Sequence, residues 1–548
     1  MKIEDQNLKD ILLKGNYVTP ENIIKAETFA KKNEISLREA LVKDGIIAKN
    51  ILGQAIAEFL HTPYADLSTN QPPKEQILKI PQVIAEKYRA VFFREDNKDV
   101  VIATDNPEHN DVISQVQSVF PGKKITLAYS LPEDVEEAFI NYRQNLETRF
   151  IKIIKEQKQV APGIIEEILE DALAYHASDI HFEPMEKDVN VRFRIDGVLW
   201  EMGKIPKDYY GNILNRIKVQ AHLRIDEHFS AQDGAIRYIR QNKAIDLRIS
   251  IVPTLDGEKI AIRILAEYVR GFTLADLGLS DADQKLVLNS AHRPFGMILV
   301  TGPTGSGKTT TLYSLIKILN RPEVHIMTIE DPVEYKILGI NQIQVNRQTD
   351  LTFSKGLPSI LRQDPDVILV GEIRGPDTAT IAVNAALTGH LLLSTFHANN
   401  AATTIPRLID MGVEPFLIAS TLELIIAQRL VRKICENCRL SVSFEEEQLK
   451  KIVPNVNNYF QKFPATLYRG KGCDLCAGTG YKGRTAIFEF IPATKEIQDL
   501  ILQEPSSKQI IEISRRQGNH SLFADGLEKA KQGVTSLEEL LRVASPYD

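Results

Sequence analysis

The stretch MILVTGPTGSGKTT, residues 297–310, decides the fold of this chain. Its first five residues form an apolar run that predicts a buried strand, and residues 310–319 alternate apolar and polar side chains at helical spacing. Between them the sequence matches the phosphate-loop pattern G-x-x-x-x-G-K-[ST] at every fixed position. A strand, a glycine-rich turn and a helix N-terminus together form an anion site, because inward N–H groups and the helix dipole both favour negative charge.

We expect the phosphate loop to bind a nucleoside triphosphate. Lys308 is expected to reach the β- and γ-phosphates, and the Thr309 hydroxyl is expected to ligate Mg²⁺. The alternative is a chance glycine-rich turn, which the strand–loop–helix context argues against. The residues predicted to surround the phosphates are Gly302, Pro303, Thr304, Gly305, Ser306, Gly307, Lys308, Thr309 and Thr310.

The bulk properties are those of a water-soluble protein with several domains. The chain has 548 residues, 43% hydrophobic and 25% charged, and 66 Lys and Arg against 72 Asp and Glu leave a net charge of −6. This balance argues against a protein whose main task is to coat nucleic acid. No apolar run approaches the ~18–20 residues that span a bilayer, and the polar start MKIEDQNLKD is no secretory signal. We therefore expect a cytoplasmic protein that reaches a membrane only through a partner.

All four cysteines stand in two C-x-x-C pairs: Cys435, Cys438, Cys473 and Cys476. In a reducing cytosol this arrangement favours a tetrahedral Zn²⁺ site over two disulfides. Four thiolates close the coordination sphere, which is typical of a structural metal. The interval between the pairs is longer than in the commonest zinc ribbons, so an unmetallated or redox-active arrangement stays open as the alternative.

Composition and periodicity divide the chain into four parts. Residues 1–140 predict a mostly helical N-terminal regulatory or docking domain, and residues 141–162 a charged, helix-prone linker. Residues 163–275 alternate helix and strand. Residues 276–548 predict strand–helix units around the phosphate loop, hence a parallel sheet with helices on both faces. This last part includes the cysteine unit at 430–480 and a helical tail.

Three stretches of the third part alternate apolar and polar residues, with arginines on the polar face. They are residues 190–195, 244–250 and 259–264. The pattern predicts an antiparallel sheet with one apolar and one polar face. The arginines either cover a solvated surface or reach toward the nucleotide of a neighbouring subunit.

Carboxylates follow two predicted strands of the parallel sheet. The strand at 326–329 leads into Glu330, Asp331 and Glu334, and the apolar run at 367–370 leads into Glu372. The carboxyl ends of parallel strands form the ligand-binding edge. One carboxylate of the first group could orient the attacking water, and Glu372 could serve Mg²⁺ or its bound waters. The alternative for the first group is an acidic surface loop.

A further predicted strand is flanked by His390 and His397. Each histidine alone is more typical of a satisfied core residue. Their paired placement beside Ser394 and Thr395 favours a sensor strand near the γ-phosphate.

These motifs together resemble the four signature boxes of the secretion ATPase superfamily. The boxes are the phosphate loop, TIEDPVEY at 328–335, LRQDPDVILVGEIR at 361–374 and TGHLLLSTFHANNA at 388–401. QRLVRKICENC at 428–438 and the second cysteine pair resemble, more narrowly, the ATPases of type IV pilus extension and type II secretion. ASDIHFEP at 177–184, VRFRIDG at 191–197, QDG at 232–234 and DLRIS at 246–250 are similar to the domain that precedes the family's ATPase core.

The resemblance implies an α/β fold with a RecA-like parallel-sheet ATPase core, preceded by a PAS-like α/β domain and a helical N-terminal domain, with a tetracysteine zinc insertion. It implies a cytoplasmic homo-hexamer at the inner face of the cytoplasmic membrane. Such a hexamer hydrolyses ATP with Mg²⁺ to drive assembly of type IV pili or related pseudopili. The implied partners are an inner-membrane platform protein and pilus alignment proteins, so that membrane association is indirect.

The resemblance also implies roles for single residues. Glu334 resembles the general base or water-orienting residue, Glu372 the Mg²⁺-side carboxylate, and Lys308 and Arg194 complete the catalytic set. Arginines contributed across a subunit interface would make hydrolysis depend on domain closure, because phosphoryl transfer needs positive charge on the γ-phosphate. Further residues expected around the nucleotide are Glu330, Asp331, His390, His397, Arg248 and Arg263.

The N-terminal domain resembles the secretion-ATPase N-terminal domain, some members of which bind cyclic di-GMP through a motif that opens with Arg-Leu-Gly. The corresponding positions here read Asn7-Leu8-Lys9 and Ser36-Leu37-Arg38. The absence of the stacking arginine and its glycine argues against cyclic di-GMP and favours docking to an inner-membrane complex.

Several functions compete for this sequence. A pilus assembly motor is the first, and type II protein secretion is the alternative with the same motor chemistry. A nucleic-acid translocase would predict a basic pore, so the near-neutral charge argues against direct contact with nucleic acid. A nucleotide-gated scaffold with little turnover is disfavoured by the intact Lys308, Glu334 and Glu372.

Overall fold

A computed structural model describes residues 5–33, 35–109, 111–143, 146–156, 160–240, 243–265, 273–346, 348–473, 476 and 478–546. The chain divides into two compact units, residues 1–271 and 272–548. No helix within the described ranges is long and apolar enough to cross a membrane.

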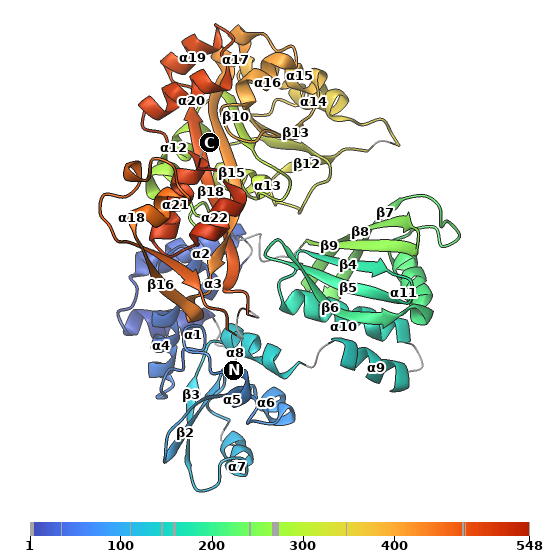
Figure 1. Cartoon of the computed structure of the whole chain (residues 1–548), viewed down its shortest axis with the longest axis vertical. Helices are drawn as coiled ribbons and strands as arrows, with labels where there is room; N and C mark the ends of the chain where they lie inside the picture. Colours follow the sequence, from blue (N-terminus) through green and yellow to red (C-terminus); the bar gives the residue numbers. More distant parts are fainter. Residues whose placement is uncertain are drawn as a thin grey trace. The chain divides into compact units, whose positions relative to one another are not determined.

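The first unit begins with a cluster of four short helices, α1 to α4, and two further short helices lead into a small sheet (Figure 1). The helices bury one apolar face each, so that Leu12, Leu41 and Leu52 meet in a common core. β1 pairs antiparallel with β2, and β2 pairs parallel with β3. The elements are α1 (Asp5–Lys14), α2 (Pro20–Asn33), α3 (Leu37–Lys43), α4 (Lys49–Phe59), α5 (Lys74–Ile77), α6 (Gln82–Tyr88), β1 (Ala90–Glu95), β2 (Asp99–Thr104), α7 (Asp111–Gln117), β3 (Lys124–Tyr129) and α8 (Pro132–Ala138).

Part of the segment predicted as a linker at 141–162 belongs to a folded core. It forms α9 (Leu146–Glu156) and the start of α10 (Val160–Ala174). Leu146, Phe150 and Ile153 of α9 are buried against the strands of the following sheet. Glu147 and Lys152 lie on the exposed side of this amphipathic helix, whereas Arg149 is mostly buried and pairs with Glu167 and Asp171 of α10.

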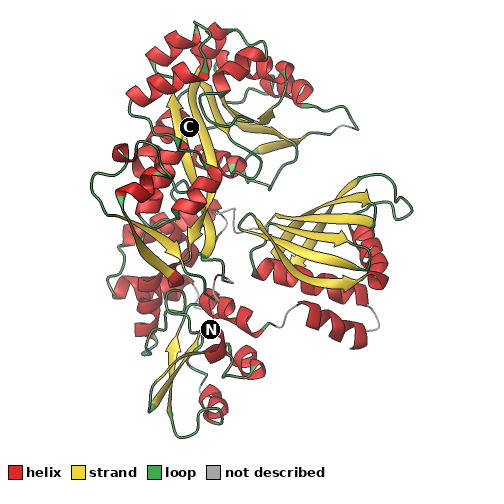
Figure 2. Ribbon diagram, viewed as in Figure 1, coloured by secondary structure: helices red, strands yellow, loops and turns green. Residues whose placement is uncertain are grey.

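The rest of the first unit is a six-stranded sheet covered on one face by helices (Figure 2). All neighbouring strands are antiparallel, in the order β6-β5-β4-β9-β8-β7, as the alternation predicts. Ile180, Phe182 and Phe193 point into the core with the helices, and the arginines lie on the opposite face. The elements are β4 (Asp179–Pro184), β5 (Asp188–Ile195), β6 (Val198–Pro206), α11 (Lys207–Gln220), β7 (Gln232–Arg240), β8 (Lys243–Thr254) and β9 (Gly257–Leu265).

The second unit is built on a seven-stranded sheet in the order β12-β11-β13-β14-β10-β15-β18. Six strands are parallel, and β18 alone runs antiparallel to its neighbour β15. Alternate residues of one strand face opposite sides: Leu299 packs in the core under α14, α15 and α17, and Ile298 in the core under α12 and α13. The predicted parallel sheet with helices on both faces is confirmed.

The elements of this sheet and its helices follow the predicted strand–helix alternation (Figure 1). They are α12 (Asp281–Ala291), β10 (Gly296–Thr301), α13 (Lys308–Leu319), β11 (Ile326–Glu330), β12 (Asn341–Gln344), α14 (Phe353–Leu361), β13 (Val367–Ile373), α15 (Pro376–Leu387), β14 (Leu391–Phe396), α16 (Thr404–Asp410), α17 (Pro415–Thr421) and β15 (Leu422–Ile434).

The first cysteine pair follows the end of β15, and the second pair precedes the start of β18. These two strands are antiparallel neighbours in the sheet. A two-stranded antiparallel sheet of β16 and β17 stands between the pairs in sequence, and four helices complete the chain. These elements are β16 (Arg439–Phe444), α18 (Glu446–Lys450), β17 (Ala465–Gly470), β18 (Tyr481–Pro492), α19 (Lys495–Ile501), α20 (Ser507–Arg516), α21 (Leu522–Lys531) and α22 (Leu537–Val543).

Candidate nucleotide site and cysteine cluster

The phosphate loop connects the end of β10 to the start of α13, as the sequence predicts. Gly302 and Gly307 adopt φ values of +148° and +85°, which side chains with a Cβ rarely take. A Cβ on Gly302 would lie only 2.4 Å from the carbonyl oxygen of Gln428 on β15. The loop therefore lies directly against the backbone of the neighbouring strand, and glycine is what permits this approach.

Lys308 is folded back into the loop that precedes it. Its Nζ donates hydrogen bonds to the carbonyl oxygens of Gly302 at 2.9 Å and Pro303 at 3.1 Å, and the side chain is buried. Burial lowers the pKa of this ammonium, and the negative charge of Glu372 partly opposes that shift. Because neutral carbonyls hold the ammonium, a phosphate can replace them without breaking an ion pair.

Polar side chains that the phosphate-loop pattern does not specify lie in and beneath the loop, on the side that faces β15. Gln428 is fully buried, and its Oε1 accepts a hydrogen bond of 2.6 Å from the hydroxyl of Thr311 on α13. The hydroxyl of Ser306 is buried with no hydrogen-bond partner among the described residues. A buried hydroxyl without a partner is an available donor within the loop, and such a donor at the start of a helix fits a bound anion such as a phosphate.

Glu372 lies on β13 at the same edge of the sheet as the phosphate loop, separated from β10 by one strand, β14. Its Oε2 is 2.6 Å from Nε of Arg374 and 3.4 Å from Nε2 of His397, which follows β14. The carboxylate is 12% exposed. A carboxylate at this depth, one strand away from a phosphate loop, can face a cation bound to the phosphates.

The two histidines expected together are separated by the length of β14. The backbone N–H of Gly296, at the start of β10, donates to the carbonyl oxygen of His390, so His390 lies at the amino edge of the sheet. Its ring contacts the carbonyl oxygen of Ala385 at 2.9 Å. A six-residue strand is about 20 Å long, so the expectation that His390 contacts the nucleotide is wrong, and only His397 reaches the phosphate edge.

The carboxylates at and after the end of β11 differ in burial, which the sequence did not reveal. Glu330 is 2% exposed, and its oxygens accept from the hydroxyls of Thr328 and Tyr313, each at 2.5 Å. Burial raises the pKa of Glu330 and outweighs these hydrogen bonds, which lower it. Glu334 is half-buried four residues further on. Glu330 is therefore engaged inside the protein, which leaves Glu334 as the better placed of the two for a water.

Tyr313 and Gln342 are the partners that sequence reasoning missed. Tyr313 lies on the apolar face of α13, where an aromatic residue is typical of a core position. Gln342 is on the short edge strand β12, and its Nε2 approaches Glu330 at 3.4 Å. Neither residue carries a motif, so the sequence offered no signal for them.

The predicted arginines form a row across the polar face of the antiparallel sheet. In register, Arg194, Asp179, Arg263 and Arg248 are neighbours on β5, β4, β9 and β8. Asp179 takes an ion pair from Arg194 at 3.6 Å and another from Arg263 at 3.2 Å. Arg194 and Arg263 thus share the carboxylate of Asp179, and Arg248 stands next to Arg263 in register.

The four cysteines converge, as the two C-x-x-C pairs predict. The Sγ atoms of Cys435 and Cys473 and those of Cys438 and Cys476 are 3.8 Å apart, and those of Cys473 and Cys476 are 3.7 Å apart. Four Zn–S bonds of about 2.3 Å at tetrahedral angles place sulfurs about 3.8 Å apart, whereas a disulfide bond measures about 2.05 Å. The cluster fits a tetrahedral metal and excludes disulfides in this arrangement.

Backbone N–H groups support the same interpretation of the cluster. The amide of Gly472 points at Sγ of Cys438 at 3.3 Å, and those of Cys473 and Gly480 point at Sγ of Cys476 at 3.2 Å. Hydrogen bonds donated to sulfur favour the thiolate, which is the form that binds a metal.

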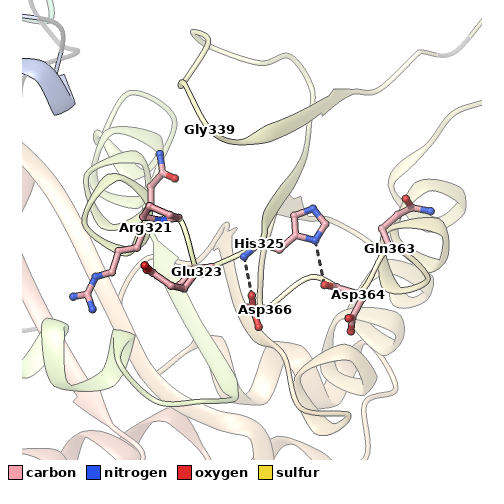
Figure 3. A pocket seen from close by; sticks show the side chains of 10 residues that line it. Arg321, Glu323, His325, Gly339, Gln363, Asp364 and Asp366 are labelled. Atoms are coloured by element: carbon pink, nitrogen blue, oxygen red, sulfur yellow. Dashed lines mark hydrogen bonds between the residues drawn. The ribbon is translucent and has the colours of Figure 1, made fainter.

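A separate open pocket lies at the amino edge of the parallel sheet (Figure 3). It has a volume of about 730 Å³ and is lined by the segment between α13 and β11 and by residues that precede β12 and β13. There the backbone N–H of His325 donates to Asp366 at 2.7 Å, and its ring contacts the carbonyl oxygen of Asp364. Since the phosphate loop is at the carboxyl edge, this pocket is not the nucleotide site.

Known proteins are similar to this chain over most of its length. The family described as type II/IV secretion system protein matches residues 154–542, and the MshEN domain matches residues 60–149. A type IV pilus assembly ATPase, PilB, of Thermus thermophilus is 37% identical over 523 residues, which cover 92% of this chain and 58% of that protein. PilB of Myxococcus xanthus is 36% identical over 564 residues, which cover 98% of this chain and 99% of that protein.

Two further similarities each cover 71% of this chain. Type II secretion system protein E of Pseudomonas aeruginosa is 44% identical over 394 residues, 71% of this chain and 77% of that protein. Among solved structures, the ATPase DotB of Legionella pneumophila superposes with a TM-score of 0.53 at 21% identity, covering 71% of this chain and 97% of that one. The structural match shows a shared fold.

Proposed function

The chain belongs to the family of type II/IV secretion system proteins, and from this membership we propose that it hydrolyses ATP to drive assembly of a type IV pilus or a related pseudopilus. The observation that carries the proposal is the near full-length match to a relative named as a type IV pilus assembly ATPase. The phosphate loop and two carboxylates at one edge of the sheet supply the chemistry.

Within the site, we propose that each residue has a distinct task. Lys308 leaves the carbonyls of its own loop for the β- and γ-phosphates, and Thr309 and Glu372 hold Mg²⁺ directly or through water. Mg²⁺ would neutralise charge that develops on the phosphates. Glu334 orients the attacking water, because Glu330 is already engaged by two hydroxyls.

We infer that the antiparallel sheet is the PAS-like domain of this family and that its arginine row completes the site in a homo-hexamer. Arg194 and Arg263 share the carboxylate of Asp179, and Arg248 is the register neighbour of Arg263, so the row concentrates guanidinium groups that could face a phosphate. An arginine supplied to a γ-phosphate accelerates hydrolysis by ~10³–10⁵. Hydrolysis would then depend on closure of the domain over the nucleotide, which is how a chemical step becomes a movement.

We propose that the cysteine cluster holds a structural Zn²⁺. The sulfur separations of 3.7–3.8 Å and the amide donors to sulfur support this assignment. The ion would join the ends of β15 and β18, and β15 also forms the floor of the phosphate loop at Gln428.

The proposed partners are an inner-membrane platform protein and pilus alignment proteins, with the motor at the inner face of the cytoplasmic membrane. Type II protein secretion is the second candidate function. One observation favours it: the identity to a type II secretion protein is 44%, although over only 71% of this chain. The pilus assembly relative matches 98% of the chain, including the N-terminal part.

A measurement of ATP turnover tests the proposed function. The purified full-length protein is assayed alone, with DNA, and with the cytoplasmic domain of its cognate platform protein. Stimulation by the platform domain and not by DNA supports a pilus or secretion motor. Stimulation by DNA alone would make a nucleic-acid translocase the better description.

The variant Glu334→Gln tests the site assignment in the same assay. It is expected to bind ATP with an affinity within about threefold of wild type and to lose about 10²–10⁴-fold in kcat, because general-base catalysis contributes that much. Turnover at the wild-type rate would move the assignment to Asp331 or Glu330.

A further inference from the structure

The hydroxyl of Tyr313 lies at the centre of a hydrogen-bond network that joins the phosphate helix α13 to the acidic loop. It donates to Oε2 of Glu330 at 2.5 Å. It accepts from the backbone N–H of Glu334 at 3.2 Å and from Nε2 of Gln342 at 3.5 Å. A tyrosine hydroxyl has one donor and two acceptor sites, so this one is fully used.

The carboxylate of Glu330 fixes the direction in which the hydrogen bonds of this network run. The carboxylate of Glu330 can only accept, and its second oxygen already accepts from Thr328. The hydroxyl proton of Tyr313 must therefore point to Glu330, which turns the oxygen lone pairs toward the N–H of Glu334. A buried carboxylate without a hydroxyl donor would be costly, so this orientation is strongly preferred.

The same helix makes a second contact with the acidic loop. The Tyr313 ring is 1% exposed and meets the ring of Tyr335 edge-on, with centroids 4.7 Å apart. Lys317, one turn further along α13, places Nζ 5.2 Å from the centre of the Tyr335 ring. Residues 334 and 335 are thus held to one face of the helix whose first turn carries Lys308.

From these contacts we propose that Tyr313 is a positioning residue for catalysis: its hydroxyl fixes the backbone at Glu334 relative to the phosphate helix. This inference rests on the proposed function, in which Glu334 orients the attacking water. Lys308 and Tyr313 are on one rigid helix, about 7–8 Å apart along its axis. A movement of the phosphate-binding end of α13 therefore carries the Glu334 backbone with it, and the water-orienting carboxylate keeps its distance to the γ-phosphate.

The variant Tyr313→Phe tests this role with little change in packing, because the ring and its contact with Tyr335 remain. It removes the acceptor of the Glu334 N–H and one donor to Glu330. We expect kcat to fall about tenfold to a hundredfold, the effect of a displacement near 1 Å at a reacting group. The dissociation constant for ATP is expected to stay within about twofold of wild type, since Lys308 and the loop are untouched.

Tyr481→Phe is the matched control. It removes a tyrosine hydroxyl in the same unit that makes a side-chain hydrogen bond, to Ser536 at 2.6 Å. This variant is expected to keep the wild-type kcat. Thermal unfolding of both single variants checks that each is folded at the assay temperature.

A double-mutant cycle with Glu334→Gln identifies the residue through which Tyr313 acts. If Tyr313 works by positioning Glu334, Tyr313→Phe causes no further loss of single-turnover rate in the Glu334→Gln background. A wild-type kcat in Tyr313→Phe, or an equal loss in both backgrounds, would overturn the inference and leave the proposed function intact. Wild-type turnover in Glu334→Gln would instead overturn the assignment of Glu334, and the inference with it.

Discussion

Replacing Gly302 with alanine tests whether the phosphate loop is positioned by its close contact with the backbone of β15. At Gly302 φ is +148°, and an added Cβ would lie 2.4 Å from the carbonyl oxygen of Gln428 and 2.8 Å from the hydroxyl oxygen of Ser306. The carbonyl belongs to β15, which is paired with β10 on one side and β18 on the other. The strand is fixed from both sides, so the loop must move, and ordinary contact requires a shift of about 1 Å.

A shift of about 1 Å in the phosphate loop is expected to lower both the rate of hydrolysis and the stability of the protein. Misplacing a reacting group by about 1 Å costs about a hundredfold in rate, and backbone strain with overpacking costs about 1–3 kcal/mol of stability. We expect Gly302→Ala to lower kcat/KM for ATP about a hundredfold and to weaken nucleotide binding, because the inward N–H groups and Lys308 move together.

The assays are steady-state ATP hydrolysis, titration with a fluorescent nucleotide, and thermal unfolding of the full-length protein. Gly412→Ala is the matched control: φ is +84° there, and an added Cβ meets nothing within 4 Å, so only left-handed strain of about 1–2 kcal/mol remains. It is expected to keep wild-type turnover. Turnover and binding within twofold of wild type in Gly302→Ala would refute the claim that the Gln428 carbonyl positions the loop.

Two further predictions concern the C-terminal part of the second unit. Cys473→Ser is expected to remove zinc from the purified protein, measured by atomic absorption, and to destabilise this part, because structural zinc contributes ~10–16 kcal/mol in model peptides; stoichiometric zinc in the variant would exclude the four-thiolate site. Burial alone would raise the pKa of Glu539, but hydrogen bonds from Arg542 and Arg432 hold that pKa below its usual range. The ionised Glu539 therefore stabilises the folded protein above the unfolded-state pKa of ~4.3, and this stabilisation is lost as the pH falls through the lower pKa of the folded state. Glu539→Gln is expected to lower the free energy of unfolding by about 3 kcal/mol at pH 7, with a difference from wild type that shrinks below pH 4 in denaturant titrations; a difference independent of pH would contradict this account.

The sequence was most informative where the chemistry is contiguous in the chain. The phosphate loop needs a strand, a glycine turn and a helix start in direct succession, so residues 297–310 contain the whole geometry of the turn. The two C-x-x-C pairs behave in the same way, because each pair is a local knuckle and only one partner remained to be found. Alternation of apolar residues predicted the antiparallel sheet and its arginine face.

The sequence was least informative about how deeply a side chain is buried and about which edge of the sheet a residue occupies. His390 and His397 flank one strand and looked equivalent, but the parallel pairing of β14 with β10 places only His397 at the phosphate edge. The segment at 141–162 looked like a linker because its charges are frequent, and α9 nevertheless buries Leu146 and Phe150.

The sequence alone determined that this protein has a phosphate loop, a parallel sheet around it, an antiparallel sheet with arginines, and a four-cysteine cluster. Only the tertiary structure decided that Glu330 is buried against Tyr313 and Thr328 while Glu334 stays half-buried in the loop. The physical reason is the range of the forces involved. Hydrophobic periodicity and turn chemistry act between residues close in the chain, whereas burial and hydrogen-bond partners depend on which strands and helices pack together, and no local pattern records that choice.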